Sequence, residues 1–271
     1  MPGSARIGIG GWTFAPWRGV FYPRGLAHAQ ELGFATRSFS TLEINGTFYS
    51  TFRKATWRKW RDAAPDSFVY AVKASRFCTH RKVLADAGPS VAGFLSQGLT
   101  ELGPKLGPIN WQFAATKRFD PADFDAFLKL LPKAKDGIPL RHAIEVRHPS
   151  FDTAELVALA RRHRVAIVYA EGKGVPKIDE DTAGFRYARL MTAKARLKAG
   201  LTSAEIARYA ALARKWQRRG DAFLYMISAA KVRNPAAALA LAAEVSDRKG
   251  TAHARIQAAA RESSKTETAR R

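Results

Sequence analysis

Cysteine is almost absent from this chain, which has only Cys78 in 271 residues. A single cysteine excludes an intramolecular disulfide and any zinc site built from a cysteine cluster. Long apolar runs are also missing, so no segment has the length of a membrane span. Residues 1–6 contain no hydrophobic region of a signal peptide. We therefore expect a cytoplasmic protein without a membrane partner.

Acidic residues are scarce, since 23 Asp and Glu stand against 45 Lys and Arg and leave a net charge of +22. Such an excess favours polyanions or anionic substrates. Residues 248–271 carry seven Lys and Arg, two Glu and no aromatic residue, which predicts a disordered basic tail. The tail accounts for +5, so +17 remains on residues 1–247, which we expect to form one domain.

Several familiar site motifs are missing. The glycines that begin at Gly8 do not match GxGxxG, because Thr13 occupies the third glycine position. There is no HExxH, no His-x-His and no GxSxG sequence. We therefore predict no cofactor.

Eight short apolar segments alternate with longer amphipathic ones. The segments of strand type are residues 6–11, 41–45, 68–73, 108–113, 142–147, 165–170, 185–190 and 222–228. Helical patterns cover residues 56–64, 121–131, 152–163, 203–219 and 234–245. This alternation over about 250 residues is typical of a (β/α)₈ TIM-type barrel, with a doubly wound sheet as the rival. Residues 171–184 contain Gly172, Gly174 and Pro176 and no helical pattern, which predicts a degenerate sixth helix.

The alternation of side chains along the strands points to a site. Successive side chains of a strand face opposite sides. In residues 41–45, 68–73, 108–113 and 142–147, one face is wholly apolar and the other becomes polar toward the C-terminal end. That second face carries Glu43, Asn45, Lys73, Gln112, Glu145 and Arg147. Barrel active sites are built at this end, so we predict a polar pocket at the mouth.

Five motifs in order resemble those of one family. They are GGW at 10–12 with Trp17 and FYP at 21–23, TLEIN with TFY over 41–49, FVYAVKA at 68–74 with Arg76, Thr79 and His80, LG with KLGP and Gln112 from 102, and AIEVRH at 143–148. They are similar to the YecE-like family, domain of unknown function 72. The resemblance runs from residue 6 to about 241 and implies a cytoplasmic TIM-type barrel, without implying a reaction.

The chain departs from the family pattern near its C-terminal end. The family often has His-Gly after the arginine of the seventh strand, whereas Arg189 is followed here by Leu190. It often has paired asparagines at the end of the eighth strand, where this chain has Ser228 and Ala229. These differences disfavour a mechanism that needs a seventh-strand imidazole or eighth-strand amides.

Glu43 and Glu145 are the candidate catalytic residues, because paired carboxylates can divide acid and base roles. Lys73 and Arg147 at the same level would keep them ionised, which suits a base better than an acid. The alternative is an ion-pair network that fixes the mouth. The candidate substrate-binding residues are Trp12, Asn45, Tyr49, Lys73, Arg76, His80, Gln112, Arg147, His148 and Arg189. The same cations disfavour a divalent metal, and we predict no metal site.

Two functions are compatible with these residues. The first is a hydrolase or lyase that acts on a phosphate-bearing small molecule, with Glu43 or Glu145 as the base. The alternative is a non-catalytic, sequence-tolerant nucleic-acid-binding protein. It is favoured by the +17 of residues 1–247 and by residues 186–219, which hold ten Lys and Arg and one Glu. The sequence does not indicate an oligomeric state.

Overall fold

The computed structural model describes residues 3–246, so the predicted tail from residue 248 lies outside the described residues. Its main sheet is parallel throughout, with the strand order β8-β7-β4-β3-β2-β1-β11-β10-β9. The strands are β1 (Ala5–Gly10), β2 (Thr41–Ile44), β3 (Val69–Lys73), β4 (Leu106–Gln112), β7 (His142–Glu145), β8 (Ala166–Ile167), β9 (Tyr169–Glu171), β10 (Arg186–Leu190) and β11 (Ala222–Met226).

The two edge strands of this sheet are neighbours in the sequence. Strands β8 and β9 stand at opposite ends of the order, yet Val168 alone separates them. The N–H of Val168 donates to the carbonyl of Ile144 in β7 at 2.9 Å. The two segments therefore act as one interrupted sixth strand, and the sheet closes into the predicted barrel of eight strands. The doubly wound rival is excluded.

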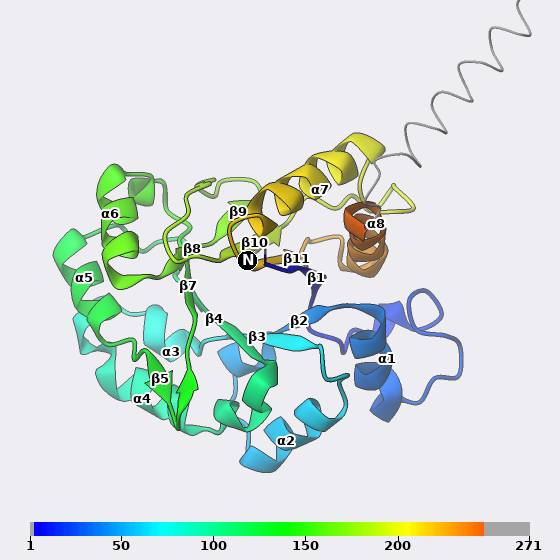
Figure 1. Cartoon of the computed structure of the whole chain (residues 1–271), viewed down its shortest axis with the longest axis horizontal. Coiled ribbons are helices and arrows are strands. Elements are labelled where there is room, and N and C mark those ends of the chain that lie inside the picture. The colour runs from blue at the N-terminus through cyan, green and yellow to red at the C-terminus, as the bar shows by residue number, and fades with distance from the viewer. Residues whose placement is uncertain (1–2, 247–271) are drawn as a thin grey trace, which may run out of the picture.

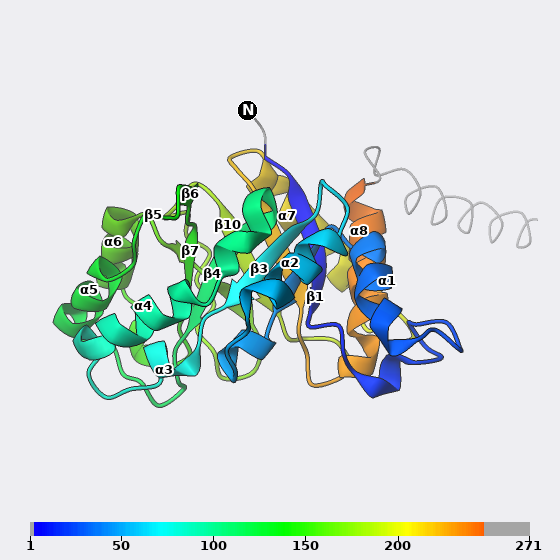
Figure 2. The ribbon, with the colours of Figure 1, turned by 90° about the horizontal axis from the view of Figure 1, so that it is seen from below.

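Helices surround the strands (Figure 1). They are α1 (Glu31–Ser38), α2 (Lys54–Asp62), α3 (Arg76–Thr79), α4 (Gly88–Ser96), α5 (Pro121–Lys129), α6 (Ala154–His163), α7 (Ser203–Gln217) and α8 (Asn234–Ser246). The five predicted helices are present, whereas α1, α3 and α4 were not predicted. A two-stranded antiparallel hairpin, β5 (Ala134–Lys135) and β6 (Ile138–Pro139), precedes β7 (Figure 2). In the described part of the chain, every helix is too short or too polar to span a bilayer.

The sixth helix is missing from the ring, as predicted. The segment between β9 and β10 contains no helix. Its Thr182 hydroxyl donates to the carbonyl of Val165 at 2.6 Å and accepts the N–H of Ile167 at 3.3 Å. These two bonds satisfy backbone groups beside β8, where a neighbouring strand does not reach them. The Thr182 side chain thus supplies hydrogen bonds to this part of the barrel, where no helix covers the strand.

Two apolar clusters confirm the predicted alternation. The larger lies between strands and helices and includes Leu42, Tyr70, Ile109 and Ile144. The smaller fills the barrel and consists of Val69, Ala71, Ala143, Ala166, Val168, Phe185, Tyr187, Phe223 and Tyr225. Residues of the second set precede the polar ones along their strands. The barrel is therefore plugged below its mouth, and polar side chains gather above the plug.

Candidate active site at the barrel mouth

Arg189 of β10 joins the two candidate carboxylates. Its Nη1 donates to both oxygens of Glu145, at 2.7 and 2.9 Å, and its Nη2 donates to Oε2 of Glu43 at 3.1 Å. All three side chains are buried. Burial opposes the charge of Arg189, but the two carboxylates outweigh it and raise the pKa of the guanidinium above its ordinary value. The alternation of side chains placed Glu43 and Glu145 on one face, and the structure brings both into direct contact with Arg189.

Every oxygen of Glu145 is already occupied. Besides Arg189, Oε1 accepts two hydrogen bonds from Arg147, at 2.8 and 3.0 Å. The amides of Gln112 and Asn110 donate to Oε2 at 2.8 and 3.2 Å. Burial would raise the pKa of Glu145, but Arg189 and Arg147 overcome it and lower the pKa to about 2. Glu145 is therefore ionised at neutral pH, with no lone pair left for substrate.

Glu43 accepts fewer hydrogen bonds than Glu145, but both of its oxygens are hydrogen-bonded. The Tyr187 hydroxyl donates to its Oε1 at 2.5 Å, and the Asn110 amide, which also binds Glu145, donates at 3.3 Å. Burial and the charge of Glu43 hold the pKa of Tyr187 well above its ordinary value, so the phenol stays a donor. The two carboxylates thus form the ion-pair network that the sequence left as an alternative to acid–base chemistry.

Lys73 at the end of β3 has no such partners. Its side chain is buried, and within residues 3–246 no hydrogen bond or ion pair reaches its Nζ. The ammonium lies 3.7 Å from the centroid of the Phe48 ring. Burial and the positive Arg189 lower the pKa of Lys73 to about 8, against an opposing effect of Glu43 and Glu145. Among the buried cations of the mouth within residues 3–246, this amine is therefore the one without a hydrogen-bond or ion-pair partner.

A cavity of about 360 Å³ opens beside Lys73, within the size range of small-molecule sites. It is lined by Gly10, Gly11, Trp12, Thr13, Phe14, Trp17, Asn45, Gly46, Tyr49, Lys73, Arg189, Ile227, Ser228, Lys231 and Asn234. Three of these side chains are cationic and none is acidic. Arg189 Nε and Asn45 Oδ1 are buried without a hydrogen-bond partner. The cavity therefore offers donors, an acceptor and positive charge to a ligand.

The part of the cavity wall that follows β11 lies where many barrels have a phosphate-binding subsite. Ser228 donates to Oδ1 of Asn234 through its hydroxyl at 2.6 Å and through its N–H at 3.2 Å. A short helix, η7 (Lys231–Arg233), follows and leads into α8. Barrels frequently bind phosphate between the loops after strands seven and eight and a short extra helix. Lys231 and Ser228 line the cavity at this place.

The structure divides the predicted binding residues into three groups. Trp12, Asn45, Tyr49, Lys73 and Arg189 line the cavity. Gln112 and Arg147 bind Glu145 instead. Arg76, His80 and His148 lie outside both groups.

The three outlying residues have other neighbours. Arg76 is exposed and lies 5.4 Å from the Phe77 ring. His148 is held by Ser150, with 2.8 Å between Nδ1 and Oγ, and caps the short helix η6 (Pro149–Phe151). His80 lies in a separate groove.

Sequence reasoning missed several residues of the mouth. Tyr187 shares a face with Arg189, so the parity argument would have found it on β10. Asn110 stands two residues before Gln112 on β4, so the same argument would have found it. Ser228 and Lys231 follow the eighth strand, where the position of the barrel phosphate subsite was an available signal.

An open groove of about 550 Å³ follows β3 and β4. It is lined by His80, Arg81, Lys82, Ala114, Thr116, Lys117 and Arg118, again without an acidic side chain. Lys117 is engaged by Asp123 at 2.7 Å. Burial and the nearby cations Lys73, Arg147 and Arg76 lower the pKa of His80, so it is neutral at pH 7. This groove lies at the same end of the barrel as the cavity.

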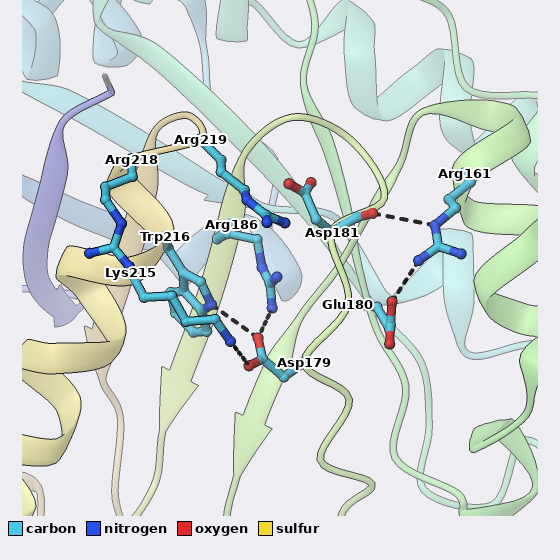
Figure 3. Close-up of a pocket in the computed structure, with 9 residues that line it drawn as sticks. All are labelled: Arg161, Asp179, Glu180, Asp181, Arg186, Lys215, Trp216, Arg218 and Arg219. Atoms are coloured by element: carbon cyan, nitrogen blue, oxygen red, sulfur yellow. Dashed lines mark hydrogen bonds and ion pairs between the residues drawn. The ribbon is translucent and has the colours of Figure 1, made fainter. Parts of the chain in front are cut away.

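A further cavity, of about 370 Å³, lies at the opposite end of the barrel near Arg186 (Figure 3). Several of its charged side chains pair with one another. Asp179 binds Arg186, Lys215 and the Trp216 indole, and Arg161 binds Glu180 at 2.6 Å. Because barrel sites are built at the other end, we assign this network to holding the segment that replaces the sixth helix. Residues 3–246 contain no group of three His, Cys, Asp or Glu suited to a metal ion.

Lys73 is expected to react with amine reagents at a lower pH than ordinary lysines. Its acylation by an activated ester should reach half its maximal rate near pH 8, whereas an ordinary lysine titrates at about 10.4. The measurement is peptide mass spectrometry of full-length protein labelled briefly over a pH series. Lys105 is the internal control, because it is equally buried but donates to the carbonyls of Arg61 and Ala64 at 2.9 and 2.6 Å. Equal labelling of the two lysines at pH 8 would contradict the prediction.

Comparison with known proteins agrees with this barrel. Residues 6–262 match the family described as protein of unknown function DUF72. No curated protein matches the sequence. A DUF72 family protein of Thermotoga maritima, TM1631, is 22% identical over 88% of this chain and 96% of its own, with a TM-score of 0.70. Another from Enterococcus faecalis, EF0366, is 18% identical over 89% and 94%, with a TM-score of 0.68.

A sugar epimerase has a more distant likeness. The structure of D-psicose 3-epimerase in the presence of D-fructose is 14% identical over 81% of this chain and 93% of its own, with a TM-score of 0.50. At these identities the three structures establish the shared barrel fold.

Proposed function

The chain belongs to the DUF72 family, whose description assigns no reaction, and from the contacts at its barrel mouth we propose that it is an enzyme acting on a phosphate-bearing small molecule. The reaction class is a hydrolase or lyase. The observation that carries the proposal is the cavity beside Lys73, which has three cationic side chains, no acidic one and a buried unpartnered Arg189 Nε. Buried donors without partners cost free energy unless a ligand or water satisfies them.

The ends of the cavity suit the two parts of such a substrate. Lys231, after β11, supplies positive charge for the phosphate oxygens. Trp12 and Tyr49 supply flat walls for a sugar ring or another organic group. Lys73 then faces the organic part. Preorganised donors of this kind stabilise negative charge that develops during reaction, which is usually the largest catalytic contribution.

The carboxylates take a different role from the one expected of them. A general base must accept a proton from substrate within hydrogen-bond reach. Glu43 and Glu145 spend their oxygens on Arg189, Tyr187, Arg147 and two amides. We therefore assign them as positioning residues that hold Arg189 at the cavity wall. Lys73 is the group that meets the substrate.

Lys231→Met is expected to weaken the binding of glycerol 3-phosphate about 10- to 100-fold, because hydrogen bonds to charged groups contribute roughly 1.5–3 kcal/mol. Isothermal titration of full-length protein measures this. Lys133→Met is the matched control, since Lys133 is exposed and precedes β7 at the other end of the barrel. Equal affinities of both variants and the unmodified protein would contradict the phosphate subsite.

The reaction itself is tested with a panel of phosphorylated sugars and sugar acids. Turnover of one of them should fall by about two orders of magnitude or more in Lys73→Arg, because arginine keeps the charge but cannot lose its proton. Lys133→Arg should leave turnover unchanged. A reaction that is indifferent to Lys73→Arg would overturn the role of this amine.

A nucleic-acid-binding protein is the second candidate, favoured by the groove of Arg81, Lys82 and Arg118 at the same end of the barrel. Backbone binding would make affinity fall with salt, at a log–log slope of about −0.9 per duplex phosphate neutralised. The test titrates duplex and single-stranded DNA or RNA at two salt concentrations, with the full chain and with residues 248–271 removed. Binding that survives truncation and is lost in Arg81→Ala/Arg118→Ala favours this candidate; binding that disappears with the tail favours the small anion.

A further inference from the structure

Lys73 is unique among the buried cations of the described chain. Four Lys and Arg side chains in residues 3–246 are buried, namely Lys73, Lys105, Arg186 and Arg189. Lys105 donates to two carbonyls, Arg186 binds Asp179, and Arg189 binds both carboxylates. Lys73 alone has only an aromatic ring beside it, at 3.7 Å. It is 7% exposed, and that remaining exposure opens to the mouth cavity.

We infer that the Lys73 amine forms an imine with the carbonyl carbon of a phosphorylated aldehyde or ketone bound in the mouth cavity. The inference rests on the proposed phosphate site, and it adds the class of substrate. A lysine becomes a nucleophile when it is desolvated or placed next to another cation. Lys73 meets both conditions, since burial and Arg189 are the two largest causes that lower its pKa.

The step balances without an added oxidant or reductant. The lone pair of the neutral Nζ forms a bond to the carbonyl carbon as the C=O π bond breaks, and one of the two amine protons passes to the carbonyl oxygen. The carbinolamine nitrogen then loses its remaining proton to the hydroxyl, the C–O bond breaks to release water, and a C=N bond forms. Amine and carbonyl compound thus give imine and water. Protonated, the imine draws electrons from the adjacent carbon, which is what a lyase needs.

The surroundings of Lys73 suit each stage. Asn45 Oδ1 and Arg189 Nε, both unpartnered, line the same cavity and can hold the carbinolamine hydroxyl and the departing water. The Phe48 ring face that now carries the ammonium would equally carry the iminium cation. The carboxyl groups of Glu43 and Glu145 favour a positive charge at this nitrogen.

The position of the phosphate subsite limits the substrate. Lys231 and Ser228 come from the loop after β11, and Lys73 comes from β3, yet all three line one cavity of about 360 Å³. A molecule that reaches both must carry its carbonyl a few bonds from its phosphate. Short phosphorylated carbohydrates have this arrangement.

Borohydride trapping tests the imine. Full-length protein is incubated with dihydroxyacetone phosphate, reduced with sodium borohydride and analysed by peptide mass spectrometry. We expect a stable secondary amine on Lys73 with at least about tenfold the occupancy of any other lysine, because more of this amine is neutral at pH 7.5. Glycerol 3-phosphate, which has the phosphate but no carbonyl, should suppress the adduct. Dihydroxyacetone, which lacks the phosphate, should give far less.

Lys73→Arg is the matched variant, since it keeps the positive charge beside Phe48. It should still bind glycerol 3-phosphate and should give no adduct at residue 73. No adduct on Lys73 with dihydroxyacetone phosphate, glyceraldehyde 3-phosphate or ribose 5-phosphate would overturn the imine. If glycerol 3-phosphate still binds, the phosphate site survives that failure; if it does not, both proposals fail. Labelling spread evenly over surface lysines also overturns the imine.

Discussion

Replacing Arg189 with methionine is expected to lower the free energy of unfolding by about 3–5 kcal/mol at pH 7, the cost of breaking a buried ion pair from one side. The side chain is buried and pairs with Glu43 and Glu145, which are themselves buried. Methionine fills a similar volume but removes the Arg189 ion pair of Glu43 and leaves Glu145 with Arg147. The measurement is guanidinium-induced unfolding of the unmodified protein and the variant.

The cost should shrink as the pH falls. In the unmodified protein, Arg189 and Arg147 hold the pKa of Glu145 at about 2 against an ordinary 4.5. A depressed carboxyl pKa stabilises the fold above the unfolded value, and this stabilisation is lost as the pH drops from about 4.5 toward 2. Without Arg189 the stranded carboxylates take up protons more readily, since burial then dominates. The variant should therefore approach the unmodified protein between pH 7 and pH 4.5.

Two controls isolate the stranded charge. Arg208→Met breaks an ion pair with Glu171 at the surface, where Arg208 is 45% exposed, and should cost no more than about 1 kcal/mol. Adding Glu43→Gln and Glu145→Gln to Arg189→Met removes the unpaired charges and should restore part of the stability. A further additive loss in the triple variant would mean that packing, and not charge, accounts for the cost of Arg189→Met.

The barrel could be predicted because the patterns that indicate it lie within short segments of the sequence. A strand buried on both faces shows its inner face by a period of two, and this period placed Glu43, Lys73 and Glu145 inward without any knowledge of their neighbours. The missing sixth helix was visible as glycine and proline between two strands. Helices α1, α3 and α4 have only eight, four and nine residues, and in helices this short the tertiary packing decides the state.

The contacts of the site could not be predicted. The alternation of side chains along a strand shows which face a residue lies on, but not which other residue it contacts. Arg189 meets Glu43 across 146 positions in sequence, and Glu145 across 44. Three arginines and lysines were equally good partners for two carboxylates. Only the closed barrel decides that Arg147 and Arg189 take the carboxylates and that Lys73 is left over. The fold therefore determines which cations pair with the carboxylates and which one is left without a carboxylate partner.

A second prediction concerns Gly8 of β1. Because this residue has no side chain, residues of the two neighbouring strands can touch each other across it. Gly8 is in register with Thr41 of β2 on one side and Tyr225 of β11 on the other. The hydroxyls of these two residues lie 2.8 Å apart across the glycine, and Thr41 also donates to the carbonyl of Val69 at 2.6 Å. A Cβ on Gly8 would lie 1.8 Å from the backbone oxygen of Thr41. Backbone cannot move away as a flexible side chain could.

Gly8→Ala is therefore expected to cost about 3 kcal/mol of unfolding free energy, at the upper end of overpacking in a core. Gly93→Ala is the matched control, because its Cβ in α4 would meet nothing within 4 Å. That change should stabilise the protein by roughly 0.5–1 kcal/mol, as alanine replaces glycine inside a helix. Guanidinium unfolding of both variants gives the comparison. Gly8→Ala should also weaken glycerol 3-phosphate binding, since Gly10 ends β1, and Gly11 and Asn45 directly follow β1 and β2 at the cavity wall. Unchanged stability and affinity would contradict the close approach of these strands.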